Sequence, residues 1–137
     1  MLSKTNQIIT TISGISETLG AIIISEIGDI YRFDSPSKLV AFAGLDVKVN
    51  QSGKFSGTKN KISKRGSPYL RRAIWLAASR AAFCDPILSD YYQSLKSRGK
   101  HHLTAIGAVA RKLCNIIFVI LRKNRPYQIN PPLNLKI

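Results

Sequence analysis

Hydrophobic residues recur every three to four positions over most of the chain, which is the period of an α-helix with one buried face. The pattern is strongest near the C-terminus, where Ile106, Leu113 and Ile117 share one apolar face. A short alternation of apolar and polar residues at Val47–Val49 instead predicts a brief strand. The spacing predicts a mainly α, compact domain with helices over residues 18–27, 36–44, 69–83, 86–95 and 104–123.

Polar residues, glycine and proline mark the predicted helix ends. Ser16 or Glu17 lies at the start of the first helix, where a side-chain oxygen can accept a hydrogen bond from a free backbone N–H group. Gly28 follows its last apolar residue. Ser35 and Ser67 each precede a proline, and this pair is typical of the N-cap and the first helical position.

The composition indicates one folded domain. Hydrophobic residues make up 45% of the 137 positions, which is enough to form a core. We expect the domain to cover residues 1–127, and residues 128–137 to form an irregular tail because prolines follow one another there.

Charge is unevenly distributed along the chain. There are 21 Lys and Arg against 7 Asp and Glu, for a net charge of +14. Three bases and five acids lie at or before Asp46, which leaves eighteen bases and two acids after it. Such an excess attracts polyanions, and nucleic acid is the usual polyanion in a cell. We therefore expect a nucleic-acid-binding surface after Asp46; a basic surface that serves only solubility is the alternative.

Cysteine, histidine and acidic residues give no sign of a metal site. Cys84 and Cys114 lie in apolar helical surroundings and are predicted to be small core residues. His101 and His102 are adjacent, so they point in different directions on a helix, and we expect them at the surface or near phosphate. The acids are scattered, which argues against a two-metal nuclease site, and no metal or cofactor is expected in this chain.

No transport signal or membrane span is predicted. The N-terminus lacks a basic region followed by an apolar stretch and a small-residue cleavage site. The longest apolar run, residues 106–121, contains Arg111 and Lys112. We expect a cytoplasmic protein with no membrane contact.

The turn over residues 12–16 has Gly14 between apolar residues and precedes a helix. A helix-hairpin-helix uses such a turn to bind DNA, because N–H groups at a helix start donate to a phosphate and the helix dipole favours its negative charge. Gly14 is therefore a candidate nucleic-acid contact. An ordinary corner between two helices that needs a glycine is the alternative.

The segment after the predicted strand is basic, rich in Gly and Ser and poor in apolar residues. It predicts an exposed loop whose cations neutralise phosphates and whose glycines, including Gly53, allow the backbone to approach a strand. A solvated charged face is the alternative, but no acid interrupts the run. The candidate nucleic-acid contacts are Lys48, Lys54, Lys59, Lys61, Lys64 and Arg65, continued by Arg71 and Arg72 in the next helix.

An ordered set of short motifs resembles one family. The set is Ile12-Ser13-Gly14-Ile15, Glu26-Ile27-Gly28-Asp29-Ile30, Arg32-Phe33, Leu39-Val40-Ala41-Phe42-Ala43-Gly44-Leu45, Gln51-Ser52-Gly53 and Ile62-Ser63-Lys64-Arg65-Gly66-Ser67. It is similar, over about Thr5 to Tyr127, to the C-terminal domain of insertion-sequence-110-type transposases, which are RNA-guided DNA recombinases. Each motif is weak alone, and their order is what is specific.

The resemblance implies a serine nucleophile in the Ser-Gly step after the Ala-Gly-Leu segment, which is Ser52 here. Its hydroxyl would attack a DNA phosphodiester and form a covalent phosphoserine. Serine is a weak nucleophile at neutral pH, so it needs a base and cations that stabilise the transition state. The candidate cations are Lys54, Lys64, Arg65, Arg71 and Arg72.

The chain departs from the family pattern in two ways. The family's turn often reads Gly-apolar-Gly, whereas this chain has Gly14-Ile15-Ser16. Family members also carry an N-terminal resolvase-like domain with four metal-binding acids, so Mg²⁺ is expected only with such a partner domain. We expect a truncated element, a split-gene product or an excised domain that is inactive alone. DNA, a guide RNA and further copies in the full-length protein are the expected partners; the alternative is a non-catalytic module that binds DNA or structured RNA.

Overall fold

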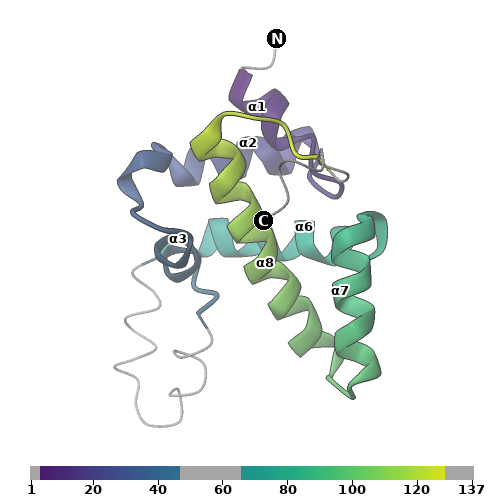
Figure 1. Cartoon of the computed structure of the whole chain (residues 1–137). Helices are drawn as coiled ribbons and strands as arrows, with labels where there is room; N and C mark the ends of the chain where they lie inside the picture. The colour runs from purple at the N-terminus through teal and green to yellow at the C-terminus, as the bar shows by residue number, and fades with distance from the viewer. Residues whose placement is uncertain (1–3, 47–65, 129–137) are drawn as a thin grey trace, which may run out of the picture.

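The computed structural model describes residues 4–46 and 66–128, and most of this part is helical. No strand occurs within those two ranges, which confirms the mainly α prediction; the strand expected at residues 47–49 lies outside them. In chain order the elements are α1 (Lys4–Ile9), α2 (Glu17–Ile27), the 3-10 helix η1 (Ile30–Arg32), α3 (Pro36–Phe42), α6 (Pro68–Cys84), α7 (Pro86–Ser97) and α8 (His102–Lys123) (Figure 1).

Helix α8 is the centre of the fold, and it crosses α6 diagonally (Figure 1). It also contacts α1, α3 and α7, and α2 packs on α6. The buried face of α6 consists largely of alanines, which allow a neighbouring backbone to pack closely. The core-facing residues of α8 include Ile106, Val109, Leu113 and Ile117, all fully buried. The predicted apolar face of α8 is therefore confirmed.

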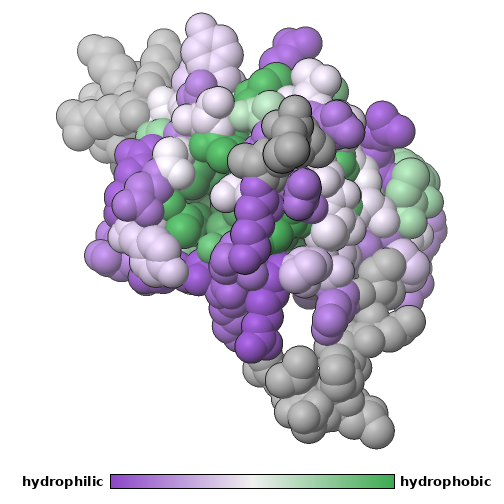
Figure 2. Space-filling view, turned by 90° about the horizontal axis from the view of Figure 1, so that it is seen from above, coloured by the Kyte–Doolittle hydropathy of each residue, from purple (hydrophilic) through white to green (hydrophobic). Residues whose placement is uncertain are grey.

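By length and composition α8 could cross a membrane, but it is the core helix of this fold. Of its most apolar 18-residue window, 61% is buried by the other helices. Elsewhere the surface is mixed: Figure 2 shows one face on which a patch of hydrophobic side chains is surrounded by hydrophilic ones.

Serine and aspartate side chains begin several helices. Ser16 Oγ accepts a hydrogen bond from Leu19 N at 3.2 Å, and Asp85 caps α7 through Leu88 N at 2.9 Å. Ser35 occupies the N-cap position of α3 without capping it by a side-chain hydrogen bond. The predicted starts at residues 16–17, 35–36 and 67–68 are confirmed, whereas α1 and η1 were not anticipated.

The two cysteines differ in burial. Cys114 is buried, and burial raises the pKa of its thiol to about 12. Cys84 is exposed, so its assignment to the core was wrong. It is the last residue of α6 and is absent from the buried face of that helix, and periodicity alone does not reveal which face is covered there.

Tyr127 attaches the irregular segment after α8 to the helical body. Its backbone N–H donates to Thr11 Oγ1 at 2.8 Å, and its hydroxyl donates to Asp85 Oδ2 at 3.2 Å. Asp85 is fully buried, and its second oxygen, Oδ1, has no hydrogen-bond partner among the described residues. Residues 125–128 have no regular secondary structure, and the predicted tail beyond Gln128 lies outside the described residues.

Candidate nucleic-acid interface

A cavity of about 730 Å³ lies between the end of α3, the first half of α6 and the first half of α8. It is open to solvent, and its described lining contains three bases and no acid. The lining residues are Gly44, Leu45, Arg71, Arg72, Trp75, Leu76, Leu103, Thr104, Gly107 and Arg111. We call it the arginine cavity.

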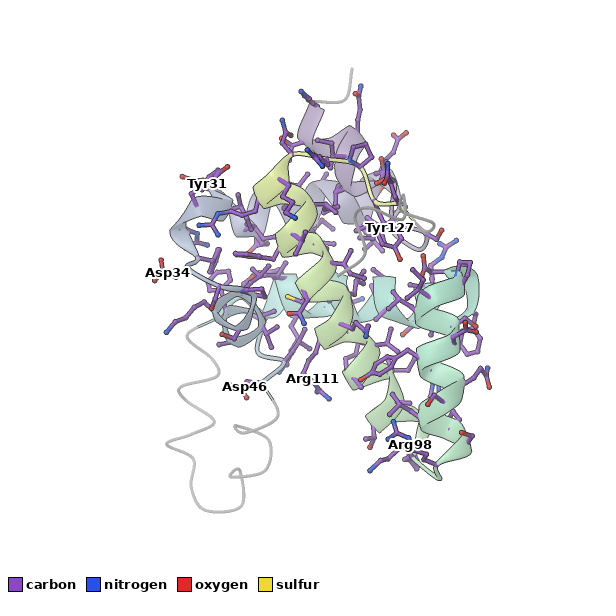
Figure 3. All side chains as sticks on the ribbon, viewed as in Figure 1. Tyr31, Asp34, Asp46, Arg98, Arg111 and Tyr127 are labelled. Carbon is purple, nitrogen blue, oxygen red and sulfur yellow. The ribbon has the colours of Figure 1, made fainter. Side chains whose placement is uncertain are left out.

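The three arginines come from two helices. Arg71 and Arg72 are exposed in the second turn of α6, and no described residue forms an ion pair or hydrogen bond with their guanidinium groups. Arg111 is half-buried on α8, and its Nη1 donates a long hydrogen bond, 3.5 Å, to Leu45 O. Figure 3 shows Arg111 on the side of α8 where Asp46 lies. Guanidinium groups that line one cavity can bind phosphate, because each presents a planar fork of N–H donors.

Trp75 forms an aromatic wall of the arginine cavity. A methyl group built on Gly107 would lie 3.6 Å from Trp75 Cζ3 and 3.7 Å from Arg111 Nη1, so the indole and this guanidinium both lie beside the glycine. The indole is half-buried, whereas Leu76 and Leu103 are 44% and 58% exposed. The cavity therefore combines an apolar, aromatic wall with cations.

Ser67 fixes the start of α6 and hence the place of its arginines. Its Oγ donates to Glu26 Oε1 at 2.5 Å and accepts from Leu70 N at 3.0 Å. The first contact attaches α6 to the end of α2, and the second satisfies a free N–H group of α6. Arg71 follows in the next turn, so the position of the cap determines where Arg71 lies along α6.

The basic segment leaves and rejoins the described structure beside the arginine cavity. Leu45, which lines the cavity, donates its N–H to Val40 O at 3.0 Å. Ser67 donates its N–H to Phe42 O at 2.8 Å, and Gly66 packs against the same carbonyl group. Both ends of the segment are therefore held at the C-terminal end of α3.

The predicted site residues are only partly covered by the described structure. Arg71 and Arg72 are described, and the fold brings them together with Arg111. The others lie outside the described residues and stay predictions: Ser52, Gly53, Lys48, Lys54, Lys59, Lys61, Lys64 and Arg65. Sequence reasoning missed Trp75 and Arg111 as site residues. The available signal was a single tryptophan near two arginines and an arginine within the apolar run of α8.

Gly14 has a packing role that accounts for the glycine. Its φ is +104°, and an added Cβ would lie 2.9 Å from both Ala77 O and Ala81 N of α6. The turn therefore approaches the α6 backbone closely, as the alternative of a helix corner requires. A phosphate contact at Gly14 stays a prediction.

The two histidines belong to the start of α8. His101 Nδ1 accepts a hydrogen bond from Leu103 N at 3.3 Å, and His102 Nδ1 lies 2.7 Å from Tyr92 Oη on α7. Both are exposed, which confirms the predicted surface position. Within the described ranges, no three His, Cys, Asp or Glu residues are grouped so that they could hold a metal ion.

Comparison with known proteins gives a consistent result. The model of the Transposase IS116/IS110/IS902 family matches residues 6–93. The chain is 33% identical over 122 residues to the IS900 42 kDa protein of Mycobacterium paratuberculosis, covering 88% of this chain and 30% of that protein. It is 27% identical over 130 residues to the IS110 43.6 kDa protein of Streptomyces coelicolor, covering 95% and 32%.

A third relative has a more informative name. The pilin gene-inverting protein of Moraxella bovis is 29% identical over 127 residues, covering 92% of this chain and 39% of that protein. The chain thus spans about a third of the length of these relatives.

Proposed function

The chain belongs to the IS116/IS110/IS902 transposase family, and from this we propose that it binds DNA and contributes the serine nucleophile of strand exchange. The observation that carries the proposal is the arginine cavity, which lies where the Ser52-bearing segment leaves and rejoins the helical body. A phosphate held by the arginines would therefore lie near both ends of that segment. The name of the pilin gene-inverting relatives supports an action on DNA.

The proposed step is a transfer of a phosphoryl group from one oxygen to another. Ser52 Oγ forms a bond to the DNA phosphorus as the bond between phosphorus and the leaving nucleotide oxygen breaks. The serine proton passes to a base, and the leaving oxygen takes up a proton. The phosphoserine ester keeps the bond energy, so a second strand can attack it and be joined without a nucleotide cofactor.

Cations are needed because negative charge builds up on the phosphoryl oxygens in the transition state. The positive charge that stabilises these oxygens can come from helices α6 and α8, through Arg71, Arg72 and Arg111. The segment itself can add Lys54, Lys64 and Arg65. A guanidinium suits the task because its planar fork of N–H groups matches two phosphate oxygens.

We further propose that activity requires a resolvase-like partner domain, a guide RNA and additional copies of the protein, all in the cytoplasm. The length of the relatives supports the partner domain, since they are about three times as long as this chain. The described residues offer no group of acids for Mg²⁺, so any metal would be held by that partner domain.

A covalent-adduct assay tests the nucleophile. The protein is incubated with labelled DNA, with and without a resolvase-like domain and guide RNA, and then denatured to leave only covalent complexes. We expect an adduct that is lost in Ser52→Ala. The matched control is Ser56→Ala, because Ser56-Gly57 is a second Ser-Gly step in the same segment. An adduct that survives Ser52→Ala, or binding without adduct under every condition, would reject the nucleophile and favour the non-catalytic module.

Salt dependence tests the binding surface separately. Each neutralised phosphate lowers the slope of log K against log salt by about 0.7 on single strands and about 0.9 on duplex DNA. The double variant Arg71→Ala, Arg72→Ala should therefore make the slope shallower by about 1.4 to 1.8. Arg80→Ala is the control, since Arg80 is exposed on the same helix outside the cavity lining. Equal effects of both variants would exclude the arginine cavity as the contact surface.

A further inference from the structure

We propose that the arginine cavity holds one unpaired nucleobase, stacked on Trp75, with the flanking phosphates on Arg71, Arg72 and Arg111. The inference rests on the proposed function, because it specifies how a nucleic-acid strand is bound. It goes beyond phosphate contact in one respect: the strand must present a base that is not paired.

The volume of the cavity fits such a ligand. At about 730 Å³ it lies within the range of about 300 to 1,000 Å³ that is usual for small-molecule sites. A surface that contacts only a DNA backbone needs exposed cations and no hollow beside them. Here the arginines border a cavity, so we expect the ligand to place a group other than its phosphates inside it.

The lining has the chemistry of a base site. The indole of Trp75 is half-buried against α8, which holds the ring in place while part of it stays accessible. Leu76 and Leu103 extend the apolar surface. Every base has a π-face that can stack on an aromatic ring, whereas its neighbouring phosphates need cations. The cavity offers both within one site.

The distribution of charge argues against other occupants. An apolar small molecule would gain nothing from three arginines, and an acidic peptide would gain nothing from the indole wall. In the described lining no carboxylate competes for the guanidinium groups. An anion with a flat, polarisable ring is the ligand that uses every part of the cavity, and a nucleotide within a strand is such an anion.

Trp75 itself reports occupancy, because it is the single tryptophan of the chain. We would titrate the protein with a 12-nucleotide DNA strand, an RNA strand of the same sequence and a blunt, G·C-rich DNA duplex. Tryptophan fluorescence measures stacking, and anisotropy of a dye on the strand measures binding. We expect quenching by a single strand at concentrations where the duplex binds without quenching. The DNA and RNA arms identify the source of the base.

Substitution separates stacking from electrostatics. Trp75→Ala should weaken single-strand binding by about 5- to 150-fold and leave duplex binding within about twofold. Trp75→Phe should retain most of the affinity, since it keeps an aromatic face. Tyr69→Ala is the control: Tyr69 is 69% exposed on the same helix and does not line the cavity. If Trp75→Ala fails to fold, as judged by circular dichroism, Trp75→Leu keeps an apolar side chain there and tests the same loss.

The two proposals fail differently. Binding of both strand types with no quenching, or with equal affinities for Trp75→Leu and the wild type, overturns the base site and leaves DNA binding intact. Quenching by the duplex equal to that by single strands also overturns it. Absence of binding to every nucleic acid rejects the proposed function, and the base site with it.

Discussion

Replacing Gly14 by alanine decides between packing and phosphate binding as the reason for this glycine. Two costs are expected in the folded state. The backbone at Gly14 has φ +104°, which a residue with a Cβ adopts at a cost of about 1–3 kcal/mol. The added Cβ would also lie 2.9 Å from Ala77 O and Ala81 N, and backbone atoms of a packed helix cannot move aside cheaply.

Overpacking of this kind costs about 1–3 kcal/mol, so the free energy of unfolding should fall by about 2–6 kcal/mol. Two other glycines calibrate the two costs. Gly99 has φ +84° and no atom within 4 Å of an added Cβ, so Gly99→Ala measures the backbone cost alone. Gly107 is helical and has only ordinary contacts, so Gly107→Ala should stabilise the protein by about 0.5–1 kcal/mol.

Urea unfolding followed by circular dichroism at 222 nm measures all three variants. The change in midpoint at an unchanged slope gives the change in stability. Gly14→Ala should be the least stable, Gly99→Ala intermediate and Gly107→Ala at or above the wild type. If Gly14→Ala is no worse than Gly99→Ala, the close approach to α6 is not what requires the glycine. If Gly14→Ala remains stable and loses DNA affinity, the packing explanation is refuted in favour of the phosphate contact.

Three further outcomes are expected. Ser67→Ala removes the cap of α6 and its bond to α2, so stability should fall by about 1–3 kcal/mol in urea unfolding; the control Ser35→Ala, which removes no cap hydrogen bond, should change it by less than about 0.5 kcal/mol. Iodoacetamide at pH 8 should label Cys84 rapidly and Cys114 only after unfolding, since burial raises the pKa of Cys114 to about 12, and peptide mass spectrometry would expose equal labelling as a contradiction. The pKa of Tyr127 is raised to about 12, mainly by burial and further by the charge and the hydrogen bond of Asp85. The contribution of Tyr127 to stability is therefore present below pH 10 and is lost as the pH rises to 12. Tyr127→Phe should make the decline between pH 10 and 12 shallower, and an unchanged decline would contradict the assignment.

Much of the helical structure could be predicted because its signals are local. Ser16 and the Ser67-Pro68 pair begin helices through contacts within one turn, and these starts are confirmed. The apolar face of α8 follows from a period that any helix imposes. The short helix α1 escaped prediction because six residues are too few to display a period, and packing on α2 and α8 stabilises it.

The candidate site was predictable only in part. The positive charge and Arg71 and Arg72 follow from composition and from the run of bases after Asp46. Arg111 does not, because it lies 39 positions beyond Arg72 and reaches the cavity only through the crossing of α6 and α8. In the sequence Trp75 is an ordinary residue of a helix. Its role in the cavity follows only from the packing of α6 on α8, which brings Gly107 next to its indole.

Sequence alone determined the helical class, most helix starts, the basic character after Asp46 and the family, because each depends on neighbouring residues or on their order. Tertiary structure decided which helix faces are covered, and so it exposed Cys84, placed Gly14 against α6 and joined three arginines and a tryptophan around one cavity. The physical reason is that helix formation responds to interactions over three or four residues. A binding site depends instead on contacts between segments that only the packing of the whole chain brings together.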